Sequence, residues 1–140
     1  MIKIVENDKE KNDALNIRKE VFVKEQGVAL EAEIDKFEDI AKHVILYHEN
    51  QPAAVGRYRA HEDGLAKVER VAVLKPFRSF GYGKDVMNFI NEKAKEDGFI
   101  GTVLNGQSHA KVFYEKLGYK AEGEEFLEEN IPHFYMKKLF

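Results

Sequence analysis

The segment Arg78-Ser79-Phe80-Gly81-Tyr82-Gly83 has the residue types needed to bind a phosphate group. Gly81 and Gly83 lack a Cβ, so their backbone can approach an anion closely and can adopt positive φ angles. If a helix begins near Lys84, its first amides have no intrahelical partner and carry the positive end of the helix dipole. Arg78 adds a planar, permanently charged guanidinium. These residues predict a pyrophosphate cradle, and the alternative is a glycine turn that merely caps a helix.

Two better-known phosphate-binding sequences match this segment poorly. A Walker loop ends in Gly-Lys-Ser/Thr, whereas Asp85 follows Lys84 here and offers no hydroxyl for magnesium. A dinucleotide-binding fingerprint has three glycines, whereas this segment has two and follows a series of hairpins. The segment therefore belongs to neither class.

A second segment, Ala110 to Tyr119, combines a short helical pattern with a tyrosine beside it. Ala110, Phe113 and Leu117 recur at helical spacing as an inward stripe, and the following glycine can end the helix. Tyr114 lies next to this stripe, and its phenol needs a polar partner. Taken alone, the pattern favours a tyrosine at the edge of a core.

The hydrophobic pattern indicates which elements position these two segments. Three short β-rich segments joined by turn sequences predict consecutive antiparallel strands. The strand–helix–strand passage from Val68 to Leu104 is a crossover, so its two strands should be parallel. The expected strands are Met1–Glu6, His43–His48, Ala53–Ala60, Ala66–Leu74, Gly101–Asn105, Tyr119–Phe126 and His133–Leu139, and the expected helices lie at Ala14–Phe22, Leu30–Ile40, Lys84–Gly98 and Ala110–Leu117. We therefore predict an α+β fold with a mixed, mostly antiparallel sheet flanked by helices.

Length and composition exclude several classes of protein. A chain of 140 residues is expected to form a single domain, 1–140, and the absence of cysteine excludes a disulfide scaffold, a thiolate zinc site and a cysteine nucleophile. A net charge of −3 disfavours nucleic-acid binding. No apolar run resembles a signal peptide or approaches the ~20 residues of a membrane helix. Because the five histidines also lack metal-ligand spacing, we expect a cytoplasmic protein with no metal, membrane or nucleic-acid partner.

Together the two segments resemble the GNAT family of acetyltransferases. The family signature Arg/Gln-x-x-Gly-x-Gly/Ala matches Arg78 to Gly83, and the later motif Ala-x-x-Phe-Tyr-Glu-Lys-x-Gly-Phe/Tyr matches Ala110 to Tyr119. The order of the elements agrees as well, so the resemblance covers nearly the whole chain. The stretch Ile17–Gln26, with Asp35 and His43, is similar to a small bacterial branch whose substrates are largely unassigned. The resemblance implies a GNAT fold with a central β-α-β unit that binds acetyl-CoA.

The resemblance also implies roles for individual residues. The strands at Glu69–Leu74 and Thr102–Asn105 would separate, and the pantetheine arm of acetyl-CoA would lie between them. Tyr114 would protonate the departing thiolate, and Glu69 would remove the amine proton directly or through water. The alternative for Glu69 is a structural ion pair with a neighbouring arginine. The residues expected to bind acetyl-CoA are Val71, Ala72, Val73, Arg78, Ser79, Phe80, Gly81, Tyr82, Gly83, Lys84, Asn105, Gln107, Ala110, Phe113 and Tyr114.

The acceptor side is less defined by the motifs. Members of the family often carry Asn where this chain has Gln107, whose amide lies one methylene farther out, and Asn105 can replace it. Two acidic groups, Glu31–Asp39 and Glu122–Glu129, are typical of solvated faces, and the alternative is that one borders the acceptor site and attracts a cationic amine. The residues expected by analogy to face the acceptor are Arg18, Phe22, Gln26 and Arg57.

The leading interpretation is an N-acetyltransferase that moves an acetyl group from acetyl-CoA directly to the amine of a small molecule or peptide. A non-catalytic CoA-binding or sensory module is the alternative, although it would need neither Glu69 nor Tyr114. A third interpretation is acyl transfer in signal synthesis, because acyl-homoserine-lactone synthases contain a similar Arg-x-x-Val-Phe stretch, but this would require a longer acyl-carrier site. Since family members are often dimers, the resemblance also implies that the chain can form a homodimer.

Overall fold

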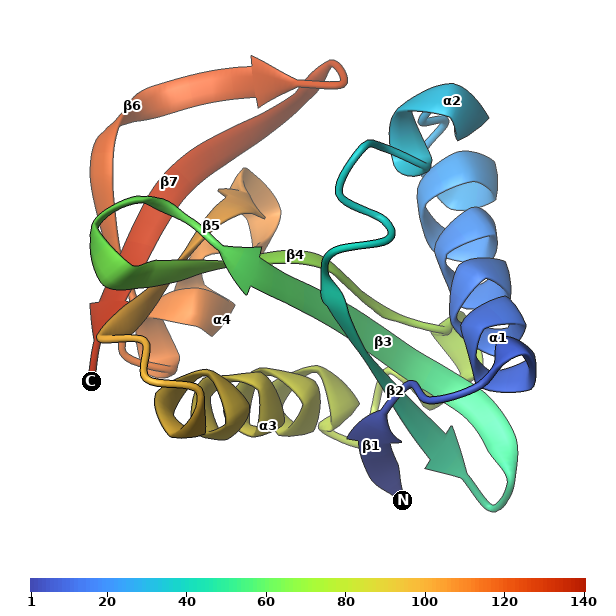
Figure 1. Cartoon of the computed structure of the whole chain (residues 1–140). Helices are drawn as coiled ribbons and strands as arrows, with labels where there is room; N and C mark the ends of the chain where they lie inside the picture. The colour runs from blue at the N-terminus through green and yellow to red at the C-terminus, as the bar shows by residue number, and fades with distance from the viewer.

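Seven strands form one mixed sheet with the order β1-β2-β3-β4-β5-β7-β6 in this computed structural model, which describes residues 1–140 (Figure 1). Their β-branched and aromatic residues suit a pleated, half-buried surface. β4 and β5 are parallel, and the five other neighbouring pairs are antiparallel. The strands are β1 (Ile2–Ile4), β2 (Lys42–His48), β3 (Gln51–Ala60), β4 (Leu65–Val73), β5 (Gly101–Gln107), β6 (Lys120–Glu128) and β7 (Ile131–Leu139). The predicted α+β fold with a mostly antiparallel sheet is confirmed.

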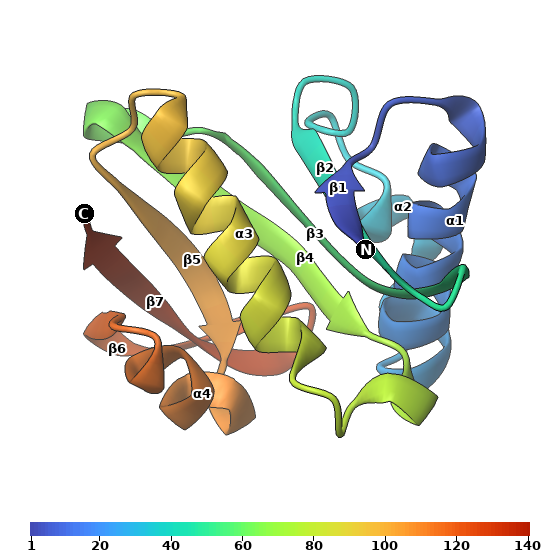
Figure 2. The same cartoon turned by 90° about the horizontal axis from the view of Figure 1, so that it is seen from below.

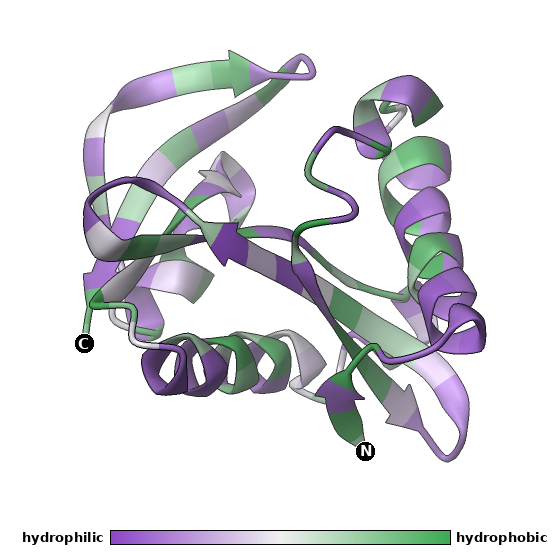
Figure 3. Ribbon diagram, viewed as in Figure 1, coloured by the Kyte–Doolittle hydropathy of each residue, from purple (hydrophilic) through white to green (hydrophobic).

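Helices cover both faces of this sheet (Figures 1 and 2). On one face, α1 (Asp8–Arg18) packs Ala14 and Ile17 against β2 and β3. On the other face lie α3 (Tyr82–Glu96) and the short α4 (Lys111–Lys116). Apolar and polar bands alternate along α3 in Figure 3, and its buried stripe consists of Val86, Met87, Ile90 and Ala94, as predicted. None of these helices is both long and apolar enough to span a membrane.

The first helix continues into a π-helical segment, Lys19–Glu25. The sequence does not predict this segment. Asn7 begins α1, because its side-chain oxygen accepts a hydrogen bond from the amide of Glu10 at 2.9 Å. The backbone stays helical through Lys19, so the wider π turns follow without a break. π-Helical turns are rare and frequently occur at functional sites. This one brings Phe22 and Glu25 toward the parallel strands.

The predicted helix Leu30–Ile40 is wrong, because only α2 (Leu30–Glu33) is helical. The carbonyl oxygen of Glu33 accepts hydrogen bonds from Arg18 Nη2 at 2.9 Å and from Arg70 Nε at 3.4 Å. The Asp35 carboxylate accepts the amide of Phe37 at 3.0 Å. Side chains therefore take the backbone groups that a longer helix would pair internally.

The two parallel strands separate halfway along their length. Their pairing runs from Leu65 opposite Gly101 to Val68 opposite Leu104 and then stops, and Figure 2 shows the divergence. The separated part of β5 is therefore residues 105–107. The resemblance implies Thr102–Asn105, which is corrected because Thr102 is still paired with β4. β4 bulges at this point, since its register with β3 shifts and Arg70 adopts a φ of 59°. The bulge turns β4 away from β5 and opens the sheet.

Candidate active site

A cleft of about 770 Å³ occupies the opening between β4 and β5. The segments that line it come from the π-helical segment and α2, from the diverging strands, from the turn before α3, from α4 and from the β6–β7 hairpin. The predicted residues that line it are Phe22, Gln26, Glu69, Val71, Ala72, Val73, Arg78, Gly81, Tyr82, Gly83, Lys84, Asn105, Gln107, Ala110, Phe113 and Tyr114. Two motifs and several isolated residues thus meet around one cavity.

The glycine turn contributes its backbone to one end of the cleft. Gly81 has a φ of 75°, which favours glycine, and α3 begins at the next residue. Of the predicted turn residues, Ser79 and Phe80 do not line the cleft. Phe80 is 52% exposed and stacks on the ring of Tyr82 with a centroid distance of 5.5 Å. Its ring therefore braces the outside of the turn, while the first amides of α3 remain available for an anion.

Arg78 is held at the mouth of the cleft by two partners. Its Nε donates to the carbonyl oxygen of Val73 at 2.9 Å. Its Nη2 donates to both carboxylate oxygens of Glu25, at 2.8 and 3.0 Å. Glu25 belongs to the π-helical segment, and nothing in its sequence context indicated this contact. A carboxylate thus occupies the guanidinium that the sequence predicts as a phosphate ligand.

A pair of amide side chains crosses the cleft beside this ion pair. Gln26 Nε2 donates to Gln107 Oε1 at 3.2 Å, and Gln107 Nε2 donates to Gln26 Oε1 at 2.8 Å. The His109 ring also contacts Gln107 Oε1 at 2.7 Å. Gln26 was expected on the acceptor side, whereas the structure joins it to a residue expected on the CoA side. The segment after the π turns therefore bridges the two diverging parts of the sheet.

Tyr114 belongs to α4, and its ring packs against β5. A Cβ at Gly106 would lie 2.9 Å from the tyrosine ring, so glycine there allows the ring to approach the strand. The rings of Phe113 and Tyr119 make edge contacts with it at centroid distances of 5.0 and 6.0 Å. Burial raises the pKa of the Tyr114 phenol, which therefore keeps its proton at neutral pH. The side chain is a proton donor that lines the cleft.

Glu69 also lines the cleft, but two arginines hold its carboxylate. Arg57 Nη2 and Arg59 Nε donate to Glu69 Oε1 at 3.1 and 2.9 Å. Burial acts to raise the pKa of this carboxyl, and the hydrogen bond from Arg59 with the charge of Arg57 outweighs it, so the pKa is lowered. The ion pair with arginine that the sequence left open is present, and it makes the carboxylate a weak base.

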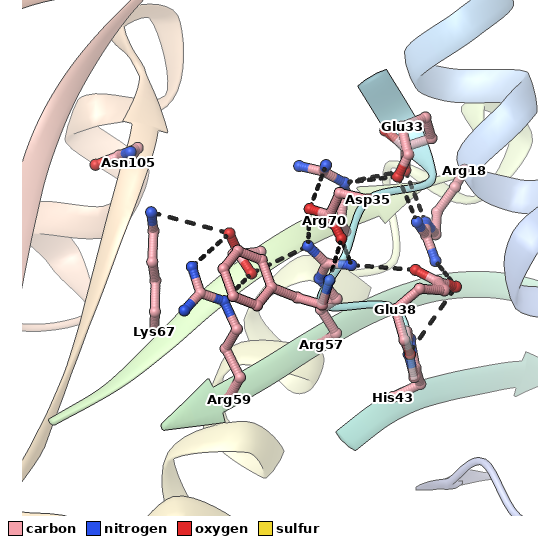
Figure 4. A network of polar contacts seen from close by, with 12 residues as sticks. Arg18, Glu33, Asp35, Glu38, His43, Arg57, Arg59, Lys67, Arg70 and Asn105 are labelled. Carbon is pink, nitrogen blue, oxygen red and sulfur yellow. Dashed lines mark hydrogen bonds and ion pairs between the residues drawn. The ribbon is translucent and has the colours of Figure 1, made fainter. Parts of the chain in front are cut away.

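Arg18 and Arg57 lie outside the cleft, in the polar network of Figure 4. Only 2% of Arg18 and 0% of Arg57 is exposed. Arg18 donates to Glu33 at 2.7 Å and Glu38 at 2.8 Å, and Arg57 donates to Asp35 at 2.7 Å. The expectation that both arginines face the acceptor is corrected, because these carboxylates already occupy the two guanidinium groups. They fix α2 and the following turn to the sheet.

The other end of the cleft lies between α2 and the β6–β7 hairpin, which face each other across the molecule in Figure 1. The segment around α2 contributes residues of the acidic group Glu31–Asp39, and the hairpin contributes residues of the acidic group Glu122–Glu129. Glu33 and Asp35 line the cleft but pair with arginines, whereas Glu128 and Glu129 come from the hairpin. Glu128 accepts a hydrogen bond from Asn105 at 3.2 Å. The structure contains no group of three or more His, Asp or Glu side chains arranged to hold a metal ion.

Comparison with known proteins gives one consistent answer. Residues 5–140 match the family model described as an acetyltransferase (GNAT) domain. The chain is 43% identical to the uncharacterized N-acetyltransferase YjcF of Bacillus subtilis over 136 residues, which covers 96% of each protein. An acyl-CoA N-acyltransferase from Pseudomonas aeruginosa superposes with a TM-score of 0.87 at 26% identity, covering 99% and 97% of the two chains. An aminoglycoside 6'-N-acetyltransferase in complex with coenzyme A has the same fold, with a TM-score of 0.82 at 15% identity over 99% and 96% of the chains.

The fold, with a sheet that opens between two parallel strands, and the match to the family model together define the class of this protein as an acetyltransferase. The chain belongs to the GNAT family of acetyltransferases, since the family model covers nearly all of it. It is an enzyme of the N-acetyltransferase class, and its acceptor is an amine.

Proposed function

We propose that residues 1–140 act as a single domain that transfers an acetyl group from acetyl-CoA directly to the neutral amine of a small molecule or peptide. The observation that carries this proposal is the end of pairing after Val68 and Leu104, which opens the cleft between two strands. Unpaired strand backbone can bind an extended chain in the manner of an added strand. The pantetheine arm of acetyl-CoA, with its two amides, is such a chain.

The cofactor end of the cleft supports the binding of an anionic nucleotide. The backbone of Val71 and Val73 would pair with the amides of the pantetheine arm. The amides of residues 81–84 and the guanidinium of Arg78 would receive the pyrophosphate, whereas the expected amide of Phe80 already donates to the carbonyl oxygen of Phe77 at 3.3 Å. Because these contacts are made mainly by backbone, the fold can select CoA with few specific side chains.

The transfer requires two proton movements. A neutral amine attacks the thioester carbonyl, a C–N bond forms, and the C–S bond breaks with its electron pair on sulfur. Tyr114 donates its proton to this thiolate and regains one from solvent. Because Arg57 and Arg59 already donate hydrogen bonds to the Glu69 carboxylate, we propose that Glu69 accepts the amine proton through water rather than by direct contact.

The test separates an enzyme from a binding module. Calorimetry with acetyl-CoA and with CoA measures binding, and a thiol-release assay over a panel of amines measures transfer. We expect micromolar binding of both ligands and release of CoA with at least one class of amine. Binding without release across a broad panel would instead favour the non-catalytic module.

A further inference from the structure

Three cationic side chains surround Glu69, where the cleft meets the ion network, and of these Lys67 lines the cleft. The register of β3 and β4 places Arg57 opposite Glu69 and Arg59 opposite Lys67. Both arginines donate to Glu69, at 3.1 and 2.9 Å, and Lys67 Nζ lies 3.9 Å from the other oxygen of the same carboxylate. Three cations thus surround one anion. Like charges directly opposite each other on paired strands are destabilising, and Glu69 is the one carboxylate that Arg59 and Lys67 share.

The wider network does not remove this excess (Figure 4). It consists of five cationic side chains and four carboxylates: Arg18, Arg57, Arg59, Lys67 and Arg70 with Glu33, Asp35, Glu38 and Glu69. His43 lies beside Glu38, and burial lowers the pKa of its ring, so it is neutral at pH 7 and adds no charge. Within this network the cations therefore outnumber the carboxylates by one, and the other carboxylates that line the cleft are Glu25, Glu128 and Glu129.

Lys67 is the member of the network that presents the excess positive charge to the cleft. Each of the four arginines donates hydrogen bonds to carboxylates or carbonyl oxygens, whereas the ammonium of Lys67 donates none. Its side chain is only 19% exposed, and it lines the cleft. An ammonium that lines the cleft and has no hydrogen-bond acceptor in the protein is available to donate charge-assisted hydrogen bonds to a bound anion.

Lys67 lies next to the place where transfer is proposed to occur. β4 and β5 separate one residue later, after Val68, and Lys67 shares a strand face with Glu69 because the two are two residues apart. We infer that the acceptor carries a carboxylate close to its amine, as an amino acid does, and that Lys67 binds this carboxylate. This inference rests on the proposed function. The same positive charge favours the neutral form of the incoming amine, which is the form that attacks.

The carboxylates of the β6–β7 hairpin are the main observation against a negatively charged acceptor. Glu128 and Glu129 would attract a second positive charge on the acceptor rather than a negative one. The Glu128 side chain is 47% exposed, and it already contacts Asn105 at 3.2 Å and His133 at 3.6 Å. Its charge is therefore screened by solvent and salt, whereas the charge of Lys67 is sheltered. The geometry favours recognition by Lys67.

The test compares amino acids with their carboxamides, which have the same side chains and amines but no negative charge. Thiol release is measured for each pair at equal concentrations of neutral amine, with the wild type and with Lys67→Met, Lys67→Arg and Lys95→Met. We expect the wild type to prefer the acid, and Lys67→Met to lower kcat/KM for it by about 10- to 100-fold, the value of a charge-assisted hydrogen bond. The amide should change little, and the KM for acetyl-CoA should not change. Lys67→Arg should keep part of the preference, and Lys95→Met, an exposed lysine on α3, should keep all of it.

An acid-to-amide ratio that Lys67→Met leaves unchanged would overturn the inference, and so would a wild-type preference for diamines over amino acids. A binding measurement keeps the inference separate from the proposed function. N-acetyl amino acids are titrated into the CoA-saturated protein by calorimetry. Binding that Lys67→Met abolishes, together with no thiol release for any amine, would support the carboxylate site and reject the enzyme. Thiol release with simple amines, together with no binding of N-acetyl amino acids by the wild type, would support the enzyme and reject the carboxylate site.

Discussion

Tyr114 shows how one side chain can be fitted for proton donation by its surroundings alone. Gly106 lets the ring lie against β5, and two aromatic edges fix its orientation. Burial then raises the pKa of the phenol, so the group carries its proton throughout the neutral range. A thiolate leaving group, with a pKa near ~8.5 as the free thiol, needs some acid assistance but does not depend on it entirely.

The first prediction concerns this phenol. Tyr114→Phe keeps the ring and its packing and removes only the proton donor. We expect kcat to fall by about 10- to 1000-fold, as is usual when a general acid is lost, while the Kd for CoA changes little. Thiol-release kinetics and calorimetry on the same preparation measure both quantities. An unchanged kcat would remove Tyr114 from the mechanism.

The residues that could be predicted from the sequence are those whose partners are close by in the chain. Gly81, Gly83 and Tyr114 belong to short motifs, and the structure brings them to one cleft. The proposed role of Lys67 could not be predicted. Its charged neighbours depend on the strand register, which places Arg59 opposite it. Arg18 and Arg57 were misplaced for a similar reason, since their carboxylate partners lie 12 to 22 residues away.

Among the elements, the segment Lys19–Gln26 has the most direct connection to cofactor binding. It crosses the opening of the sheet and reaches both sides through Glu25 with Arg78 and Gln26 with Gln107. If the CoA pyrophosphate binds at Arg78 as proposed, it meets the carboxylate of Glu25 there. This carboxylate competes for the guanidinium and repels the phosphates, so it should weaken CoA binding.

The second prediction follows from that contact. Glu25→Gln should lower the Kd for CoA by about two- to five-fold, in line with the strength of a half-exposed ion pair. Calorimetry measures the change, and it should shrink as salt is raised. Glu20→Gln is the control, because it removes the same charge from the same segment, where Glu20 pairs with Lys24 at 3.2 Å. Equal effects of the two variants would show that only the overall charge matters.

The strength of the local signal decided which elements could be predicted. The stripe of Val86, Met87, Ile90 and Ala94 has a clean helical period, and α3 is found where it was expected. The acidic segment after Leu30 has helical composition, but arginines from α1 and β4 bind its backbone and end the helix at Glu33. The π turns depend on packing of α1 over the sheet, and the residue types there do not distinguish them from an α-helix.

At the scale of the whole molecule, the ion network joins the helical layer to the sheet. Arg57 of β3 reaches Asp35 and Glu38 in the turn after α2 and Glu69 of β4. All these groups are largely removed from water, so each charge depends on its partners. The network fixes the wall of the cleft beside α2, and many charges are desolvated in it.

The third prediction tests this dependence. Arg57→Met keeps much of the side-chain volume but leaves three carboxylates without their shared partner. We expect the free energy of unfolding to fall by about 3–5 kcal/mol, the usual effect of breaking a buried ion pair. Chemical denaturation measures it. Lys42→Met, which breaks an exposed pair with Asp97, should cost less than about 1 kcal/mol, and a similar loss in both variants would contradict the buried character of the network.

The last prediction is the response of stability to acid, which should occur in two stages. Burial lowers the pKa of His43 from its ordinary 6.5. Below pH 6.5 the histidine is therefore protonated in the unfolded chain while it stays neutral in the folded protein. Stability should therefore begin to fall near pH 6.5. Below about 4.5 it should fall further, because the arginines lower the pKa values of Asp35, Glu38 and Glu69, and their ion pairs are lost as these groups protonate.

His43→Gln separates the two stages. The His43 ring contacts the carbonyl oxygen of Glu38 at 2.8 Å, and the amide of glutamine can donate a hydrogen bond to the same carbonyl without titrating. Thermal unfolding measured from pH 8 to pH 4 should then show a flat region down to about pH 5 in the variant, followed by the same steep loss as in the wild type. If the wild type is equally flat above pH 5, then the histidine is not buried as a neutral group. If the variant also loses stability from pH 6.5, another titrating group must be coupled to the network, because the carboxylates with lowered pKa values are fully ionised there.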